Sequence, residues 1–314
     1  MSEGLPSRIA VCVASYRRPE GLFALLGALD AQVFEPPQPT LRIVVVDNDP
    51  ACSARSVCEE ARRWLRHPLH YLHEKRPGIP IARNAAVAAA LDLPWLAFVD
   101  DDERPEPRWL DALRRAQHEQ SADLVAGPVL PAFESEPPGW IRRGRFLEYE
   151  PSGAHSARTG NLLVRTRCLA RQPVVFDERM VPIGEDRELF ERVAADGARI
   201  VWAPDAIVHE SVPRERATLR YVLARGHRVG VASTRIARIR SSRARAAPRA
   251  LVHGGWCVLR GLAEVALAPL RGAAAGAAGL RLLAFGLGRW RGLAGPGGRS
   301  ALSLPDRSSG RASA

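Results

Sequence analysis

The feature that most constrains the fold is an alternation along the first half of the chain. Short apolar segments rich in β-branched residues alternate with segments of helical periodicity. This pattern is typical of βα units, in which helices cover both faces of a largely parallel sheet. The predicted fold class is therefore α/β, with a Rossmann-like, mostly parallel sheet flanked by helices. Strands are expected at 9–14, 41–47, 69–72, 95–100 and 124–130, and helices from Pro19 and over 53–65, 81–91 and 106–117.

The regular alternation ends at Pro131. Two further prolines at 137 and 138 and a basic aromatic patch at 140–145 indicate a long loop over residues 131–156. Long loops without regular structure often border functional sites, so we expect this one to do so. Further strands are expected at 159–165, 174–176, 200–202 and 206–209, and a further helix over 185–195.

Charge divides the chain in two. Residues 214–314 carry 19 basic and 3 acidic side chains, a net charge of +16, whereas residues 1–213 carry a net charge of −5. We therefore expect a globular domain over 1–213, a basic amphipathic helical extension over 214–300 and a disordered tail over 301–314. The longest uncharged stretches of the extension are about half of the roughly 20 residues that a spanning helix needs. The N-terminus has no signal-peptide pattern, so a cytoplasmic protein is expected.

Several functional classes lack their motifs. The five cysteines are scattered and form no C-x-x-C pair, so neither a disulfide framework nor a zinc site is expected. No G-x-G-x-x-G follows a predicted strand, and neither G-x-x-x-x-G-K-[ST] nor G-x-S-x-G is present. These absences disfavour a Rossmann dehydrogenase, a P-loop NTPase and a serine hydrolase.

Acidic residues gather at the ends of predicted strands. Asp47 and Asp49 follow one apolar strand, and Asp100, Asp101 and Asp102 follow another. In an open α/β sheet, ligands bind in the crevice beyond the carboxyl ends of the strands. Side chains alternate along an extended segment, so Asp100 and Asp102 form a D-x-D pair whose oxygens suit Mg²⁺ or Mn²⁺. The alternative is that Asp102 caps the helix that follows.

Three further polar elements are candidates for a site. A carboxylate of Glu185 or Asp186 could act as a general base, although acidic residues are also routine in a first helical turn. His209 closes a predicted strand, and is either a structural hydrogen-bonding group or a third metal ligand beside Asp102. Arg83, at the start of a helix, either meets a phosphate or nucleotide or points into solvent.

Taken together, these motifs resemble glycosyltransferase family 2, in particular the branch that builds bacterial exopolysaccharides. The resemblance runs from about residue 9 to residue 209. It rests on V-A-S-Y-R-R-P at 13–19, V-V-V-D-N-D at 44–49, G at 78 with A-R-N at 82–84, F-V-D-D-D-E at 98–103, T-G-N-L-L at 159–163 and G-E-D at 184–186. It implies a GT-A fold and an inverting transfer of a sugar from a nucleotide diphosphate donor, with UDP expected, to a hydroxyl group.

The resemblance also implies a role for each matching residue. Residues that hold the donor nucleotide would be Ser15, Tyr16 and Arg17 around the base, Asp47 at the uracil or its ribose, and Arg83. Asp100 would contact the ribose or the metal, Asp102 would bind Mn²⁺ or Mg²⁺, and Asp186 would be the catalytic base. Binding of the sugar or acceptor is implied for Asn161, Trp140 and Glu185.

Two departures from the family pattern matter. The Asp-Asp-Asp-Glu run leaves open which carboxylates bind the metal, and Glu103 is the alternative ligand. The Q-x-x-R-W motif of processive synthases is missing. We therefore expect addition of a single sugar to a saccharide or lipid-linked acceptor rather than polymerisation.

Arginines of the extension form a stripe. Arg249, Arg260, Arg271 and Arg289 fall within about 40° of one line on a continuous helical wheel. This pattern predicts peripheral binding at the inner membrane surface, with Pro269 and nearby glycines breaking the helix into at least two pieces. The alternative for the extension is a helical subdomain packed on the core or on a second subunit. For the protein as a whole, the alternative functions are nucleic-acid binding through the basic tail and sugar-nucleotide binding without catalysis. No specific nucleic acid is expected, because regularly interleaved aromatic residues are missing.

Overall fold

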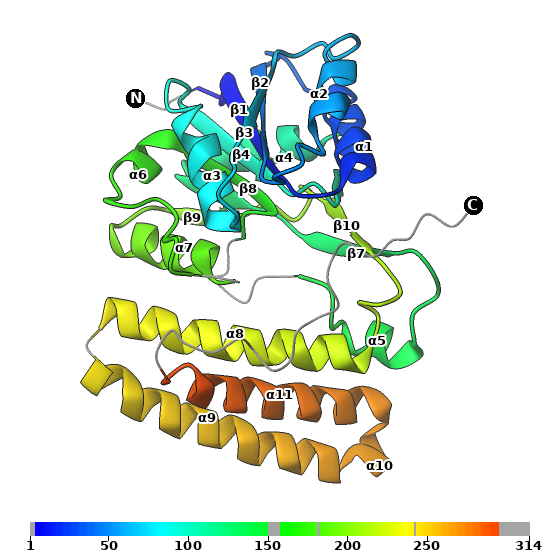
Figure 1. Ribbon diagram of the computed structural model, residues 1–314, viewed down its shortest axis with the longest axis vertical. Helices are drawn as coiled ribbons and strands as arrows, with labels where there is room; N and C mark the ends of the chain where they lie inside the picture. Colours follow the sequence, from blue (N-terminus) through cyan, green and yellow to red (C-terminus); the bar gives the residue numbers. More distant parts are fainter. Residues whose placement is uncertain (1–3, 150–157, 181–182, 242, 295–314) are drawn as a thin grey trace. The chain divides into compact units, whose positions relative to one another are not determined.

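The computed structural model describes residues 4–149, 158–180, 183–241 and 243–294, so the predicted tail at 301–314 and part of the predicted loop lie outside the described residues. The chain divides into two compact units. The sheet unit comprises Met1–Ala132 and Glu148–Ser211, and the helical unit comprises Phe133–Leu147 and Val212–Ala314. Figure 1 shows the elements of both units.

A seven-stranded sheet forms the centre of the sheet unit, with the strand order β3-β2-β1-β4-β8-β6-β9. Each described pair in it is parallel except those of β8, which runs antiparallel to both β4 and β6. The mostly parallel α/β sheet predicted from the sequence is thereby confirmed. The strands are β1 (Arg8–Ser15), β2 (Thr40–Asp47), β3 (Leu69–His73), β4 (Trp95–Val99), β6 (Leu124–Ala126), β8 (Asn161–Arg165) and β9 (Ile200–Trp202).

Helices cover both faces of this sheet, which explains why its central strands are apolar on both sides. Alternate residues of β1 face opposite ways: Val11 and Val13 belong to one buried cluster, and Ala10 and Cys12 to the other. The first cluster packs under α1 (Pro19–Asp30), α2 (Arg55–Ala61) and α4 (Trp109–Gln120). The second packs under α3 (Ile79–Ala88), α6 (Thr166–Ala170) and α7 (Glu185–Ala195) (Figure 1).

A second, three-stranded sheet has the order β5-β10-β7. The strand predicted at 124–130 is wrong, because the chain breaks at Gly127-Pro128 into β6 and β7, which belong to different sheets. A Cβ on Gly127 would lie 2.3 Å from the carbonyl oxygen of Ala206, so only glycine fits this close approach. The strands of this sheet are β5 (Glu103–Pro105), β7 (Val129–Phe133) and β10 (Val208–Val212).

The strand predicted at 174–176 is also wrong. Phe176 lies in an irregular segment, and its backbone polar groups pair with a side chain instead of a neighbouring strand. Its N–H donates to Asn84 Oδ1 at 2.9 Å, and its carbonyl accepts from Asn84 Nδ2 at 2.9 Å. The amide of Asn84 thereby supplies both hydrogen bonds that a strand partner would give.

Glycines let the long helices of the helical unit approach closely. A Cβ on Gly230 would lie 2.1 Å from the Phe285 carbonyl oxygen, and one on Gly286 would lie 2.6 Å from that of Gly254. α11 packs against both α8 and α9 in this way. The helices are α5 (Gly139–Gly144), α8 (Leu219–Arg240), α9 (Arg243–Ala266), α10 (Ala268–Arg271) and α11 (Ala273–Arg291).

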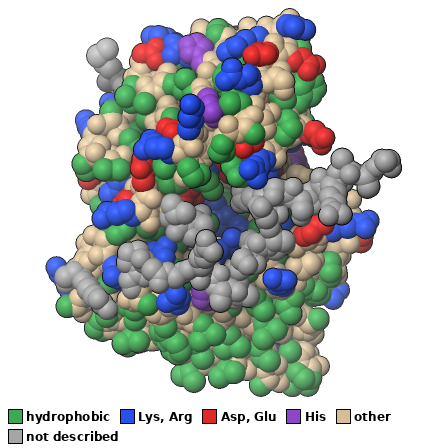
Figure 2. All heavy atoms as spheres, in the orientation of Figure 1, with side chains coloured by type: hydrophobic (Ala, Val, Ile, Leu, Met, Phe, Trp, Pro, Cys, Tyr) green, Lys and Arg blue, Asp and Glu red, His purple; other side chains and the backbone are tan. Residues whose placement is uncertain are grey.

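The break predicted near Pro269 is confirmed, since α9 ends at Ala266 and α11 runs back along it. The predicted continuous arginine stripe is wrong for the same reason: Arg249 and Arg260 lie in α9, Arg271 in α10 and Arg289 in α11. Hydrophobic side chains gather instead over α9 and α10, at the lower edge of Figure 2. None of the helices within the described segments combines the length and apolarity needed to cross a membrane.

Candidate active site

The carboxyl ends of three adjacent parallel strands bring the candidate residues together. β1 lies between β2 and β4, and Ser15 at its end is in register with Asp47. The residues that follow β4 therefore meet those that follow β1. Asp101 Oδ2 accepts hydrogen bonds from Ser15 Oγ at 3.1 Å and from the backbone N–H of Tyr16 at 3.0 Å.

Arg18 joins this edge, although the motifs predicted no role for it. Its Nη1 lies 2.9 Å from Asp101 Oδ1 and 2.5 Å from Asp102 Oδ2. The turn that brings it back passes through Arg17, whose φ of 54° is left-handed. The only signal for this role was the second arginine of the R-R-P segment. Gly21 completes the turn, because a Cβ there would lie 2.5 Å from the Asp101 carbonyl oxygen.

The three consecutive aspartates have different environments. The side chain of Asp101 is 8% exposed, whereas those of Asp100 and Asp102 are 35% and 16% exposed. Burial raises the pKa of Asp101 to about 6. The positive charge of Arg18 opposes this rise, and the negative charge of Asp102 adds to it. Asp101 therefore organises the turn, and the two outer carboxylates are the accessible ones.

A buried arginine connects the aspartate run to the start of α7. Arg83, on α3, places Nη2 2.8 Å from Asp100 Oδ1 and Nη1 2.5 Å from Glu185 Oε1. Its guanidinium thus points inward at two carboxylates, and the solvent-exposed alternative for Arg83 is wrong. Glu185 Oε2 is buried and has no hydrogen-bond partner in the parts of the chain that the structure describes.

Glu185 and Asp186 begin α7, after Gly184 in a left-handed conformation. Burial, with the neighbouring charge of Asp186 adding to it and Arg83 opposing it, raises the pKa of Glu185 to about 7. Asp186 is less buried, and its Oδ1 accepts a hydrogen bond of 2.6 Å from the backbone N–H of Arg187. The two adjacent carboxylates therefore differ in access: Glu185 faces Arg83 in the interior and Asp186 lies nearer the surface.

Asp47 organises a loop instead of facing outward. Its carboxylate is fully buried and accepts hydrogen bonds from the backbone N–H groups of Asp49 and Ala54 and from the Tyr71 hydroxyl, at 2.9–3.1 Å. The direct contact with uracil or ribose implied for Asp47 does not fit this burial. Arg17 Nε lies 3.3 Å from Asp49 Oδ1, and its guanidinium lies 5.1 Å from the centre of the Tyr16 ring. Tyr16 and Arg17 are therefore the exposed groups at this end of the sheet.

Asn161 is structural. Its amide is buried and saturated: Oδ1 accepts from Trp109 Nε1 at 2.7 Å, and Nδ2 donates to the carbonyls of Pro128 at 2.9 Å and Ala206 at 2.6 Å. These three bonds favour a structural role for Asn161 over the sugar or acceptor contact that the resemblance implies. Trp140 lies on α5 of the helical unit, where its ring packs edge-on against Phe146 at 5.3 Å between centroids.

His209 does not join Asp102. On β10 its Nε2 lies 3.0 Å from Glu106 Oε1, so the structural interpretation of His209 is the one that the contacts favour. Glu103, the alternative metal ligand, is buried and accepts a hydrogen bond of 2.7 Å from the Asp100 N–H. Burial, with the charge of Asp100 adding to it, raises the pKa of Glu103 well above its usual range, which favours the neutral form. A neutral carboxyl is a poor cation ligand.

The donor set fits a divalent cation only in part. Among the described residues no group of three or more His, Cys, Asp or Glu side chains is placed to hold a metal ion. Mg²⁺ commonly takes only one or two protein carboxylates and completes its shell with water and substrate phosphates. The partly exposed carboxylates of Asp100 and Asp102 fit that manner of binding, in which a phosphate ligand is part of the site.

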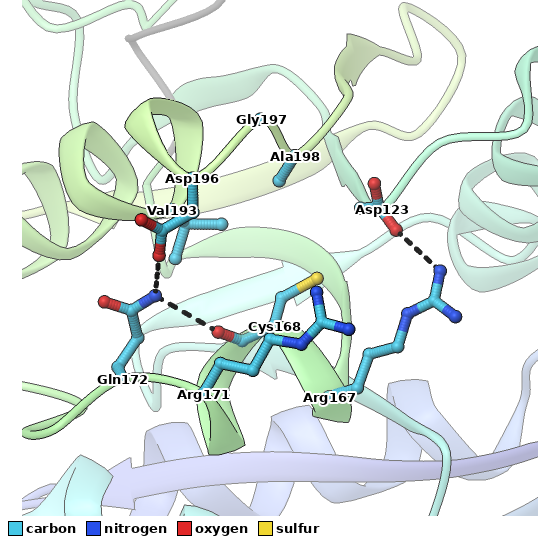
Figure 3. A pocket seen from close by; sticks show the side chains of 9 residues that line it. All are labelled: Asp123, Arg167, Cys168, Arg171, Gln172, Val193, Asp196, Gly197 and Ala198. Carbon is cyan, nitrogen blue, oxygen red and sulfur yellow. Dashed lines mark hydrogen bonds and ion pairs between the residues drawn. The ribbon is translucent and has the colours of Figure 1, made fainter.

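A separate pocket lies at the opposite edge of the sheet. Asp123 precedes β6 and Ala198 precedes β9, so the pocket borders the amino ends of these strands. Its volume is about 200 Å³, and Figure 3 shows Arg167 bonded to Asp123, and Gln172 bonded to Asp196 and to the Cys168 carbonyl. These internal pairs satisfy much of its polar lining. We therefore place the candidate active site at the carboxyl edge.

The buried position of Glu185 predicts a pH dependence of stability. Its pKa is about 7 in the folded chain against an ordinary value of 4.5, so between these pH values the folded state keeps a proton that the unfolded state releases. The free energy of unfolding should therefore fall as the pH rises from about 4.5 to 7. Urea unfolding at several pH values should show a flatter profile for Glu185→Gln. Asp101 and Glu103, whose pKa values burial also raises, leave a slope of the same sign in both proteins. A profile for Glu185→Gln that is as steep as that of the unaltered protein would contradict the assignment.

Comparisons with known proteins show the family of the chain. The model for Glycosyl transferase family 2 matches residues 10–172. The succinoglycan biosynthesis protein ExoM of Rhizobium meliloti (strain 1021) is 35% identical over 234 residues, which are 73% of this chain and 74% of ExoM. A pre-mycofactocin glycosyltransferase of Mycobacterium tuberculosis (strain ATCC 25618 / H37Rv) is 30% identical over 196 residues, 59% of this chain and 40% of that protein.

Two solved structures share the fold. The crystal structure of S. aureus TarS 1-349 in complex with UDP has a TM-score of 0.52 at 18% identity, and covers 88% of this chain and 90% of that one. The structure of GalNAc-T7 with UDP, GalNAc and Mn²⁺ has a TM-score of 0.52 at 14% identity, and covers 70% of this chain and 48% of that one. At these identities, the likeness shows that this chain shares their fold and nothing more.

Proposed function

Because the chain belongs to glycosyltransferase family 2, we propose that it transfers one sugar from a UDP-sugar to a hydroxyl group of a saccharide or lipid-linked acceptor. We propose further that the transfer inverts the anomeric configuration and needs Mn²⁺ or Mg²⁺. The observation that carries the proposal is the arrangement around Arg83. This one buried side chain contacts Asp100, in the run of three aspartates, and Glu185, next to Asp186.

The nucleotide would lie over the ends of β1 and β2. Tyr16 and Arg17 present an exposed ring and guanidinium there, which suit stacking and hydrogen bonding to a base. Ser15 and Asp47 would act indirectly, since both are buried and hold the turns that carry these groups. UDP is the nucleotide in the TarS complex named above, which supports UDP as the donor nucleotide of this chain.

The diphosphate would lie at the aspartate run. Asp100 and Asp102 would hold Mn²⁺ or Mg²⁺ together with the diphosphate oxygens, as the partial donor set requires. When bound, the cation would stabilise the negative charge of the departing UDP. Arg18 lies against Asp102, so it keeps a positive charge at the same edge and fixes the orientation of that carboxylate.

Asp186 would accept the proton of the acceptor hydroxyl. The acceptor oxygen forms a bond to the anomeric carbon from the side opposite the diphosphate while the bond from that carbon to the diphosphate oxygen breaks, so UDP leaves with the electron pair. Glu185 would hold the first turn of α7 against Arg83 and thereby position Asp186. Because Oε2 of Glu185 is buried, Glu185 would act on the sugar only through the position of Asp186.

The acceptor is proposed to belong to polysaccharide or glycoconjugate synthesis, because the relative ExoM is a succinoglycan biosynthesis protein. We place the reaction on the cytoplasmic side, with the enzyme bound peripherally to the inner membrane. The basic charge of the helical unit supports that location, since anionic lipids attract it.

A thermal-shift screen of nucleotide sugars, with and without Mn²⁺, tests the donor proposal. One UDP-sugar should raise the melting temperature, and EDTA should remove most of the rise. At a concentration 100 times its Kd, a ligand stabilises the folded state by about 2.7 kcal/mol, which is several degrees for a chain of this size. Equal stabilisation by every nucleotide, or none by any UDP-sugar, would contradict the proposal.

A further inference from the structure

A cavity of about 660 Å³ opens between α9 and α11 of the helical unit. Its lining combines two arginines, Arg249 of α9 and Arg289 of α11, with apolar side chains of α9. The rings of His253 and Trp256 pack together in this lining, with ring centroids 5.9 Å apart. The full lining is Pro248, Arg249, Val252, His253, Trp256 and Arg289. A site with this lining suits a ligand that is anionic at one end and apolar at the other.

The charge around the cavity is of one sign. None of the residues that line it is acidic, and over 243–291 the sequence contains a single acidic residue, Glu264, which pairs with Arg271 at 3.1 Å. Burial, with the charge of Arg289 adding to it, lowers the pKa of His253, so the imidazole is neutral at pH 7 and can donate or accept one hydrogen bond. The charged side chains that line the cavity are therefore all positive.

An apolar face continues from the cavity along α9. Alternate turns of the helix bury small residues against α11, including Gly254 and Gly261, so the larger apolar side chains point away from the unit. Val252 is 75% exposed and Leu259 is 70% exposed. Apolar side chains gathered in this way over α9 and α10 (Figure 2) mark a surface that binds a partner. The exposed side chains of the face are Leu251, Val252, Trp256, Leu259, Leu262 and Leu270.

We infer that this cavity binds the phosphate headgroup of an anionic phospholipid, with the apolar face of α9 seated in the acyl boundary of the bilayer. Arg249, Arg289 and His253 would meet the phosphate, and Val252, Trp256 and Leu259 would contact the lipid chains. The inference rests on the proposed function for the enzyme's place at the inner membrane. It adds the surface that binds and the lipid charge that this surface needs.

Charge favours a bilayer over a second copy of the chain. In a twofold dimer through this face, Arg249, Arg260 and Arg289 of one copy would lie near the same arginines of the other copy. These like charges would repel each other. Free phosphate would match the arginines but would leave the leucines exposed to water. An anionic lipid surface satisfies both halves of the site.

Sedimentation of the full chain with lipid vesicles tests the inference. The chain should bind vesicles of phosphatidylcholine with 30% phosphatidylglycerol at least tenfold more tightly than vesicles of phosphatidylcholine alone. The exposed-site variants Arg249→Glu and Leu259→Glu should each weaken binding to the anionic vesicles at least tenfold. Matched controls in the sheet unit, Arg63→Glu and Leu91→Glu, make the same chemical changes at exposed positions and should bind like the unaltered chain.

The outcomes separate this inference from the proposed function. Each variant should keep the melting-temperature rise given by the UDP-sugar, so loss of lipid binding with intact donor binding concerns the helical unit alone. Equal binding to both vesicles, or normal binding by Arg249→Glu and Leu259→Glu, would overturn the inference. If inorganic phosphate stabilises the chain and the chain does not bind vesicles, the cavity is a site for a free anion. If the chain does not bind vesicles but forms a dimer that Leu259→Glu dissociates, the apolar face binds a second copy of the chain.

Discussion

Asp186→Asn should reduce the turnover of sugar transfer about 10³-fold while leaving donor binding intact. The asparagine keeps the shape of the side chain but cannot accept the acceptor's proton, and loss of a positioned general base costs typically 10² to 10⁴ in rate. Release of UDP in the presence of acceptor measures the rate, and the melting-temperature rise with the UDP-sugar measures binding.

Asp92→Asn is the matched control for that variant. Asp92 is an exposed carboxylate before β4, at the amino edge of the sheet, and it pairs with Arg42 at the surface. The same chemical change there should leave turnover unaltered. Normal transfer by Asp186→Asn would show that another group is the base. Loss of donor binding in that variant would show that Asp186 contacts the donor instead.

Asp102→Ala should abolish the Mn²⁺ dependence of donor binding and reduce transfer about 10³-fold. Stabilisation of a leaving diphosphate by a bound cation contributes several kcal/mol, and each 1.36 kcal/mol is tenfold in rate. Loss of this carboxylate should cost little stability, because Arg18 keeps its contact with Asp101. The melting-temperature rise with the UDP-sugar, measured with Mn²⁺ and with EDTA, should become the same in the variant.

The neighbouring Asp101→Ala variant should behave in the opposite way. It leaves the Ser15 hydroxyl and the Tyr16 N–H without their buried acceptor, so the free energy of unfolding should fall by about 2 kcal/mol. The protein that remains folded should still bind the donor with Mn²⁺ dependence. If both variants lose metal dependence to the same degree, or if Asp102→Ala retains it, Asp102 is not the residue that binds the metal.

The sheet could be predicted from the sequence because its signal is local. Each of the strands β1, β2 and β4 is a short apolar run flanked by a helical pattern, and burial on both faces imposes that pattern. The errors came where tertiary contacts decide. The close approach of Gly127 to Ala206 splits one apolar run between two sheets, and the side chain of Asn84 replaces a strand partner for Phe176.

The site was partly predictable for a similar reason. Residue type and order marked the aspartate run and the acidic start of α7, but not which side chains face inward. Asn161 and Asp47 bind backbone groups from segments distant in sequence, so a motif alone could not distinguish them from ligand contacts. Arg18 and the link from Arg83 to Glu185 depend on the chain's turn at Arg17 and on the packing of α3 near α7.

The anomeric configuration of the product is the decisive test of inverting transfer with Asp186 as the base. We combine the purified chain with the UDP-sugar that stabilises it, Mn²⁺ and a saccharide acceptor. Proton NMR then gives the configuration of the new glycosidic linkage from the coupling of its anomeric proton. We predict a single added sugar with the configuration opposite to that of the donor, formed by unaltered protein and lost in Asp186→Asn. A product that retains the donor's configuration, or the same yield from Asp186→Asn, would contradict this mechanism.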